Sequence, residues 1–508
     1  MNAVLRRLML VVLLAWPLVV WGGEPPVDAS KASGDNAIVI QIQDALVNRT
    51  DLGFNICREV AECKKECQDA YLAMHPTTLR MGGALGHWKD PGGKIEEIGK
   101  FWPKFAEEDS LVSWALGNGM RPMYLLCYTP AWSNVKTREK FKYPNDPKTP
   151  WTMDFCPPDD PGVWKAMVKA LMVHHKGKVN RYEVWNEPNT GFYWQGEAKA
   201  KGEDELLRRY VDLCKATFEA AREVDPAIRV YTCCPHDDFF GSWTTPLFAK
   251  GIAKYTDGIC LHVYVGPQAI AAIDNWWLRY MTTIQENEKR EGKRFPLVLT
   301  EYGYNHDTHP EFGGAFSLAQ LTVILGTFKA ELATQYAFHS LKPQGDDGLC
   351  MFRGGLTDNP TSKTLRYLYA LFQNATYVPL NGATLSPGGE SFEEMGIPKK
   401  PDNKLYAFEI ARPDGSKAAY VAAWRGRFCY AKNKLIDIPD MDVAITLPKA
   451  YARAEVLDSL TGEAAKFSGF KVENGKTVLK VKLQGIHDGK EAAPRAFVLF
   501  PPQANAKE

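Results

Sequence analysis

The chain has 508 residues, which is long enough for one large domain and a second smaller one. Its 61 Lys and Arg residues nearly balance its 60 Asp and Glu residues, and this argues against nucleic acid as a partner, because nucleic acids usually bind a basic face. A neutral, hydroxyl-rich partner such as a carbohydrate fits better. Aromatic residues make up 12% of the chain, and their flat rings can stack on sugars as well as fill a core.

Residues 1–22 have the pattern of a secretory signal peptide. Two arginines at 6–7 precede an apolar run at 8–21, and two glycines follow it. The apolar run is shorter than the roughly 20 residues that a membrane span needs, which favours a cleaved signal over a membrane anchor. We therefore expect an exported protein, periplasmic or secreted, with no membrane attachment after cleavage.

The 11 cysteines do not indicate a disulfide framework. Cys127, Cys233 and Cys260 lie in apolar, strand-like runs, where cysteine packs as a small hydrophobic residue. Cys63 and Cys67 have helical spacing but lack the further ligands that a zinc site needs. No phosphate-binding glycine-rich loop follows a predicted strand. We expect neither a metal nor a cofactor.

Residues 23–49 are predicted to form a linker and then a short strand at 38–42, which could pair with the C-terminal domain. Residues 50–373 alternate short apolar runs with longer helical patterns, and this alternation predicts an α/β fold, a (β/α)8 TIM barrel. The predicted helices include 162–175 and 204–224. The eight predicted strands are Leu52–Ile56, Thr77–Met81, Pro122–Tyr128, Tyr182–Trp185, Ile228–Cys233, Gly258–Val263, Leu297–Thr300 and Gln335–Ser340.

Residues 374–508 change to alternating strand patterns separated by turn signals, such as Pro413-Asp414-Gly415. This pattern predicts a C-terminal antiparallel β-sandwich domain. We expect the domain to brace the barrel, because its apolar strands need a partner surface, and glycan binding is the alternative.

Two carboxylates stand at the ends of predicted barrel strands. Glu187 follows the fourth strand and Glu301 the seventh, and active sites of such barrels form at the carboxyl ends of the strands. An unpaired buried carboxylate is costly, so two of them converging on one cavity suggest acid–base chemistry. Retaining glycosidases use such a pair, with the carboxyl groups about 5–5.5 Å apart.

Four segments of the predicted barrel have a distinctive sequence. They are Tyr182-Glu183-Val184-Trp185-Asn186-Glu187-Pro188-Asn189, Thr300-Glu301-Tyr302-Gly303, Tyr128-Thr129-Pro130-Ala131-Trp132-Ser133 and His175-Lys176-Gly177-Lys178-Val179. With them, residues 50–373 resemble clan A retaining glycoside hydrolases, and in particular family 39, which contains β-xylosidases and α-L-iduronidases. The segment around Glu187 resembles the strand-four signature of the clan, and the segment around Glu301 resembles its strand-seven nucleophile segment.

The resemblance implies a role for each strand-end residue. Glu187 would be the general acid/base and Glu301 the nucleophile that forms a covalent glycosyl-enzyme. Asn186 would bind the sugar 2-hydroxyl, and Tyr264 would position the nucleophile. We expect burial and a neighbouring negative charge to raise the pKa of Glu187.

Three further positions complete the predicted site. Arg80 ends the second strand and should stabilise the negative charge of Glu301. His262 lies two residues before Tyr264 and therefore shares its face of the strand, as a substrate contact or a core histidine. In the long loops after the third and fourth strands, Trp132 and Trp194 are candidates for sugar-stacking platforms, with packing inside the loops as the alternative.

The predicted function is hydrolysis of O-glycosidic bonds in an oligo- or polysaccharide by double displacement. Two alternatives stay open: a non-catalytic carbohydrate-binding barrel, and a transglycosylase, which uses the same covalent intermediate. The eighth strand ends in Phe338-His339-Ser340 where the clan usually has an indole, so the family's substrates are not carried over to this chain.

Overall fold

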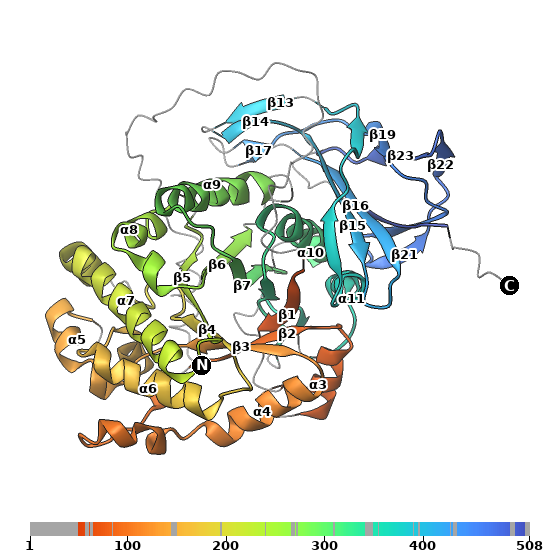
Figure 1. The fold of residues 1–508 in the computed structure, drawn as a ribbon. Coiled ribbons are helices and arrows are strands. Elements are labelled where there is room, and N and C mark those ends of the chain that lie inside the picture. The colour runs from red at the N-terminus through yellow and green to blue at the C-terminus, as the bar shows by residue number, and fades with distance from the viewer. Residues whose placement is uncertain are drawn as a thin grey trace.

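The computed structural model contains a closed barrel of eight parallel strands, in the order of the chain, surrounded by helices (Figure 1). The fold therefore confirms the predicted (β/α)8 barrel. The barrel strands are β1 Asp51–Asn55, β2 Thr78–Gly82, β3 Arg121–Leu126, β4 Arg181–Val184, β5 Arg229–His236, β6 Gly258–Val265, β7 Leu297–Tyr304 and β8 Leu332–Gln335. The structure describes residues 49–502 apart from 56–59, 61–63, 84, 144–149, 194–195, 239, 266–269, 271–272, 308–309, 341–348, 354, 390, 395–396, 427, 430–433 and 488–492.

The predicted signal at 1–22, the strand at 38–42 and Trp194 lie outside the described residues. They stay predictions.

Helices cover the outside of the barrel. The start of α6 shows how the sequence sets a boundary, because Asp160 accepts a hydrogen bond from the Gly162 N–H and Pro161 occupies the first turn. The helices are α3 Lys65–Leu72, α4 Phe105–Gly117, α5 Val135–Phe141, α6 Pro161–His174, α7 Gly196–Val224, α8 Thr244–Ala249, α9 Ile273–Glu291, α10 Gly313–Val323 and α11 Pro360–Phe372.

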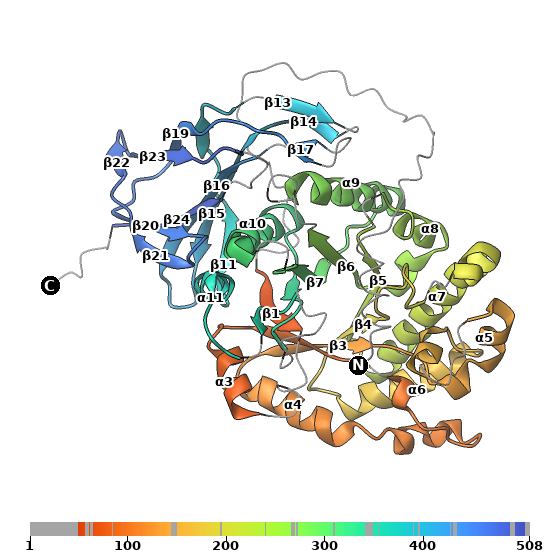
Figure 2. The same cartoon turned by 180° about the vertical axis from the view of Figure 1, so that it is seen from behind.

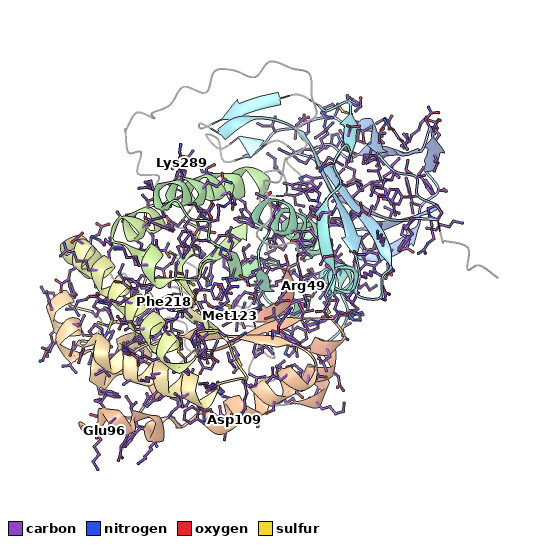
Figure 3. All side chains as sticks on the ribbon, in the orientation of Figure 1. Arg49, Glu96, Asp109, Met123, Phe218 and Lys289 are labelled. Atoms are coloured by element: carbon purple, nitrogen blue, oxygen red, sulfur yellow. The ribbon has the colours of Figure 1, made fainter. Side chains whose placement is uncertain are left out.

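Side chains fill the interior of the barrel, and Figure 3 labels one of them, Met123. Met123, Tyr231, Val298 and Leu332 form one buried cluster with two cysteines, so the lower barrel is a packed core and no channel. Asp109, also labelled in Figure 3, belongs to the outer helix α4. This core adjoins the predicted site, since its two cysteines, Cys234 and Cys260, donate hydrogen bonds to Glu183.

The predicted eighth strand, Gln335–Ser340, is wrong in position. The barrel closes through β8 at Leu332–Gln335, which pairs with β1 and with β7. Residues His339–Ser340 form a separate short strand, β9, which pairs with β10 at Phe352–Arg353. The aromatic run after Gln335 has the stronger strand pattern, but backbone pairing on both sides decides which segment closes a barrel.

Helix α10 is the most deeply buried helix of the barrel. All of its residues are buried, and with the flanking turns it forms a segment, Pro310–Phe328, that is long and apolar enough to cross a membrane. Its burial identifies it as a core helix between the barrel and the C-terminal sheets.

The C-terminal residues form two facing antiparallel sheets, which confirms the predicted sandwich. Their inner faces enclose a second core that includes Val421 and Phe497 from one sheet and Ile445 and Leu479 from the other. One sheet contains β11 Thr376–Pro379, β15 Asn403–Ala411, β16 Lys417–Arg425, β24 Arg495–Phe500, β20 Arg453–Asp458 and β21 Glu463–Lys466; the other contains β12 Thr384–Ser386, β19 Met441–Leu447, β23 Lys476–Leu483 and β22 Phe470–Glu473. Two hairpins, β13 Ser391–Glu394 with β14 Ile397–Pro401 and β17 Phe428–Cys429 with β18 Lys434–Leu435, complete the described strands.

The outer face of the larger sheet packs into the core of the barrel. In Figures 1 and 2, strands β15 and β16 lie beside helices α10 and α11. Phe372 packs edge-on against Tyr420, and the Thr322 and Tyr420 hydroxyls are hydrogen-bonded at 2.6 Å. At Gly326 a side chain would meet the Tyr406 ring at 2.6 Å, so only glycine allows this close approach. Such packing is what a brace for the barrel requires.

Candidate active site

The predicted catalytic pair meets at the carboxyl end of the barrel. Glu301 lies within β7 and Glu187 lies three residues beyond the end of β4. Both are nearly buried, and one carboxylate oxygen of each, together with a ring nitrogen of His262, lies within 4.8 Å of the others. Two carboxylates this close together can act on the same bond.

Glu301 is held by a cation and a phenol. Arg80 Nη1 donates to Oε1 at 2.5 Å, and the Tyr264 hydroxyl donates to Oε2 at 2.5 Å. Burial and the nearby charges of Glu301 and Glu187 raise the pKa of Tyr264 well above its usual value, so the phenol keeps its proton and stays a donor. The structure thus brings Arg80 and Tyr264 to the predicted nucleophile.

Glu187 is held by two imidazoles. His262 Nδ1 lies 2.9 Å and His236 Nδ1 lies 3.2 Å from the same oxygen, Oε1. Burial alone would raise the pKa of Glu187, but the charges and hydrogen bonds of the two histidines outweigh burial and lower it well below its usual range. The expectation of a raised pKa is therefore wrong, because it counted the neighbouring carboxylate and missed the imidazoles.

The protons of this cluster reside on the histidines. Burial opposes a charge on His236, but Asp237 and Glu187 outweigh it and raise its pKa to about 9. Burial likewise opposes a charge on His262, and Cys234 and Glu301 are the strongest of the groups that raise its pKa well above the usual value. An imidazolium beside a carboxylate carries the same proton count as a neutral imidazole beside a carboxylic acid.

A third buried carboxylate, Glu183, connects the two halves of the site. Its oxygens accept from Arg80 Nε at 2.7 Å and from the Thr300 hydroxyl at 2.7 Å, and His262 Nε2 lies 3.4 Å away. Burial would raise the pKa of Glu183, but Arg80 and His262 lower it well below its usual range. Sequence reasoning missed Glu183; the available signal was a charged residue within the apolar run of strand four.

The same region contains a set of atoms of the type that bind metals. Glu183, Cys234, Cys260 and His262 each place one such atom within 4.8 Å of the others. Cysteine, histidine and carboxylate together are known as zinc ligands. Here Arg80 already supplies the positive charge beside Glu183, and both thiols donate to the Glu183 carboxylate, at 2.6 and 3.0 Å. These contacts fit a hydrogen-bonded carboxylate rather than a metal centre.

Asn186 contacts Arg80, the cation that also holds Glu301. Its Oδ1 accepts from Arg80 Nη2 at 2.8 Å, which orients the amide and leaves Nδ2 as the group that can donate to a sugar. The side chain is partly exposed, as a substrate contact requires.

The backbone near Glu187 is unusual. Glu187 itself has a φ of 46°, and Trp185, Cys233, Cys234 and Asp237 also have positive φ values. Non-glycine residues in this region cost roughly 1–3 kcal/mol each and collect at functional sites. The strain falls on the ends of β4 and β5, the strands that carry the acid and its histidine.

Aromatic rings form a wall near Glu187. The Tyr128 and Phe192 rings are stacked with centroids 6.0 Å apart, and Phe155 packs edge-on against both. The Tyr128 ring also packs edge-on against Trp185, two residues before Glu187, with centroids 5.4 Å apart. Burial and Cys127 are the main causes that raise the pKa of Tyr128. Trp132 is partly buried and its indole N–H donates to the Trp88 carbonyl at 2.8 Å. Its predicted role as a sugar platform stays a prediction.

Comparisons with known proteins give similarity only at the level of structure. No protein-family model matches the chain, and no curated protein matches its sequence. A family 39 glycoside hydrolase from the gut symbiont Bacteroides cellulosilyticus is similar over 89% of this chain and 81% of its own, with 17% identity and a TM-score of 0.59.

Two further solved structures have the same fold. A monomeric β-xylosidase from Caulobacter crescentus matches 89% of this chain and 96% of its own, with 16% identity and a TM-score of 0.53. A family 30 endoxylanase from Clostridium papyrosolvens matches 89% and 97%, with 13% identity and a TM-score of 0.51. The structural neighbours are thus glycoside hydrolases, and the fold of this chain is theirs.

Proposed function

We propose that this protein is an exported retaining glycoside hydrolase that cleaves O-glycosidic bonds of an oligo- or polysaccharide. The observation that carries the proposal is the short separation of Glu187 and Glu301, whose nearest ligand oxygens lie within 4.8 Å with His262 between them. Retaining enzymes place their carboxyl groups about 5–5.5 Å apart, whereas inverting enzymes leave roughly 6.5–9.5 Å for a water molecule.

The two steps follow from the surroundings of each carboxylate. Glu301, oriented by Arg80 and Tyr264, attacks the anomeric carbon while Glu187 protonates the leaving oxygen, giving a glycosyl-enzyme and a free alcohol. Glu187 then removes a proton from water, which attacks the anomeric carbon and releases Glu301. Two inversions retain the configuration.

Positioning of the sugar supports the same mechanism. Asn186 Nδ2 is oriented to donate to the 2-hydroxyl, a contact that strengthens in the transition state. The wall of Tyr128, Phe155 and Phe192 offers ring faces for stacking beside Glu187. Export is supported by the signal pattern of residues 1–22.

The experiment that tests this proposal is a panel of aryl glycosides and polysaccharides, incubated with the wild-type protein, Glu301→Ala and the matched control Glu311→Ala. Glu311 is an exposed glutamate shortly after β7. Aryl β-D-xylosides and β-D-glucosides come first, because the structural neighbours include a β-xylosidase and a glucosidase.

Hydrolysis by the wild type and the control but not by Glu301→Ala is expected. Proton NMR of the first product then gives the anomer, and retention is expected. An inverted first product would overturn the mechanism, and binding of a glycan without turnover would favour the non-catalytic barrel. Products longer than the substrate would identify a transglycosylase.

A further inference from the structure

A second histidine, His236, is hydrogen-bonded through its backbone to the segment that carries Glu187. It ends β5, and its backbone N–H donates to Asn189 Oδ1 at 2.8 Å, while Asn189 Nδ2 donates to the His236 carbonyl at 2.8 Å. Asn189 lies two residues after Glu187, so the same short loop holds the acid and fixes the backbone of the histidine. His236 Nδ1 consequently lies 3.2 Å from Glu187 Oε1.

The opposite ring nitrogen of His236 faces a carboxylate. His236 Nε2 lies 3.4 Å from Asp237 Oδ2, and Asp237 Oδ1 accepts from the backbone N–H of Tyr264 at 3.0 Å. The Tyr264 ring lies 5.5 Å from the imidazole, measured between centroids. The titratable groups that face His236 are therefore Glu187 from the loop after β4, its neighbour Asp237, and His262 and Tyr264 from β6.

The two histidines at Glu187 differ in their access to solvent. The His262 side chain is 0% exposed, and its Nε2 lies against Thr300, Cys234 and Glu183. The His236 side chain is 19% exposed. An imidazole that reaches solvent exchanges its proton with water more readily than a buried one, so His236 suits proton exchange and His262 suits fixed orientation.

We propose that His236 is a positioning residue that holds, on Nδ1, the proton that Glu187 delivers to the leaving group. In the first step this proton passes from Nδ1 to the Glu187 carboxylate and from Glu187 to the departing oxygen, so the histidine becomes neutral and Glu187 is a carboxylate again. In the second step Glu187 takes a proton from water and His236 is recharged. The inference rests on the proposed function, because it assigns Glu187 as the acid.

Leaving groups of different basicity separate this role from a structural one. In His236→Asn, kcat/KM is expected to fall roughly 100-fold for an unactivated disaccharide and less than about threefold for the dinitrophenyl glycoside of the same sugar, because a good leaving group needs little protonation. The alkaline limb of the pH profile, near pH 9 in the wild type, should move to lower pH in the variant. His174→Asn, at the far end of α6, is the matched control and should change neither quantity.

Equal losses on both substrates, or an unchanged alkaline limb, would overturn the proposal. A second measurement needs no substrate: selective ¹⁵N labelling of histidine, followed by NMR titration of the wild type and Glu187→Gln. The pKa of His236 should fall in Glu187→Gln, and an unchanged titration would refute the proton-sharing pair. If Glu301→Ala hydrolyses the panel as well as the wild type, the proposed function fails instead, whatever the titration shows.

Discussion

The surroundings of Glu301 and Glu187 differ in kind although an oxygen of one carboxylate lies within 4.8 Å of an oxygen of the other. Glu301 lies inside a strand and contacts a permanent cation, Arg80, and a phenol that keeps its proton. Glu187 lies beyond a strand end, in left-handed backbone conformation, and contacts two imidazoles that titrate. The first region fixes a negative charge, whereas the second can gain and lose a proton. A double displacement needs one carboxylate of each kind.

The largest loss of activity is expected from replacing Glu301, whose negative charge is fixed. Glu301→Ala should lower kcat by about 10⁴-fold or more on every glycoside, because the covalent step loses its nucleophile. Measurement of kcat on one activated and one unactivated substrate checks this. Loss confined to the unactivated substrate would mean that the two carboxylates have exchanged roles.

Glu187→Ala should instead discriminate between substrates. A loss of roughly 10²–10⁴-fold is expected on unactivated glycosides and a much smaller loss on dinitrophenyl glycosides, since only the former need an acid. Added azide should restore turnover by intercepting the glycosyl-enzyme and give a glycosyl azide of retained configuration. A glycosyl azide of inverted configuration would contradict the assignment of Glu187 as the acid/base and Glu301 as the nucleophile.

Tyr264→Phe should have an intermediate effect through the nucleophile region. It removes one hydrogen bond to the Glu301 carboxylate, which corresponds to about 10-fold in kcat/KM for a bond of roughly 1.5 kcal/mol to a charged group. The loss should be equal for good and poor leaving groups, unlike that of Glu187→Ala. A loss that grows with the basicity of the leaving group would place Tyr264 in the acid region.

The smallest effect is a change in stability with pH. The pKa of His236 is raised from 6.5 to about 9 in the folded protein, so its stabilisation is complete below pH 6.5 and is lost as the pH rises through 9. The melting temperature of the wild type should therefore fall between pH 7 and pH 10 by on the order of 2 °C more than that of His236→Asn. Parallel melting curves measured by calorimetry would show that the imidazole gains no charge on folding.

Most of the barrel could be predicted because buried parallel strands appear in the sequence as short apolar runs. The same logic located Glu187, Glu301, Arg80, Asn186, His262 and Tyr264 at strand ends, and the structure brings these six side chains together. Strand eight was misplaced because pairing between strands distant in sequence, rather than apolar content, selects Leu332–Gln335.

The missing parts of the site depend on three-dimensional detail. The β5 strand continues past its predicted end at Cys233 through a register shift to His236, and an apolar pattern does not reveal such a bulge. Without His236, the sign of the pKa change at Glu187 could not be predicted. Glu183 was overlooked because its partners come from four other strands of the barrel.

The left-handed residues around the acid have a consequence for protein engineering. Trp185, Glu187, Cys233, Cys234 and Asp237 hold a conformation that glycine or asparagine adopts more readily. Screens for heat tolerance should therefore find gains of roughly 1 kcal/mol at the partly exposed Asp237, whereas at the fully buried Trp185 the lost packing would exceed any relief of strain. The same gains should reduce activity, because they relax the turns that point Glu187 and His236 at each other. Greater heat stability of this protein is best sought in the sandwich and the outer helices, where stability can rise without loosening the turns at β4 and β5.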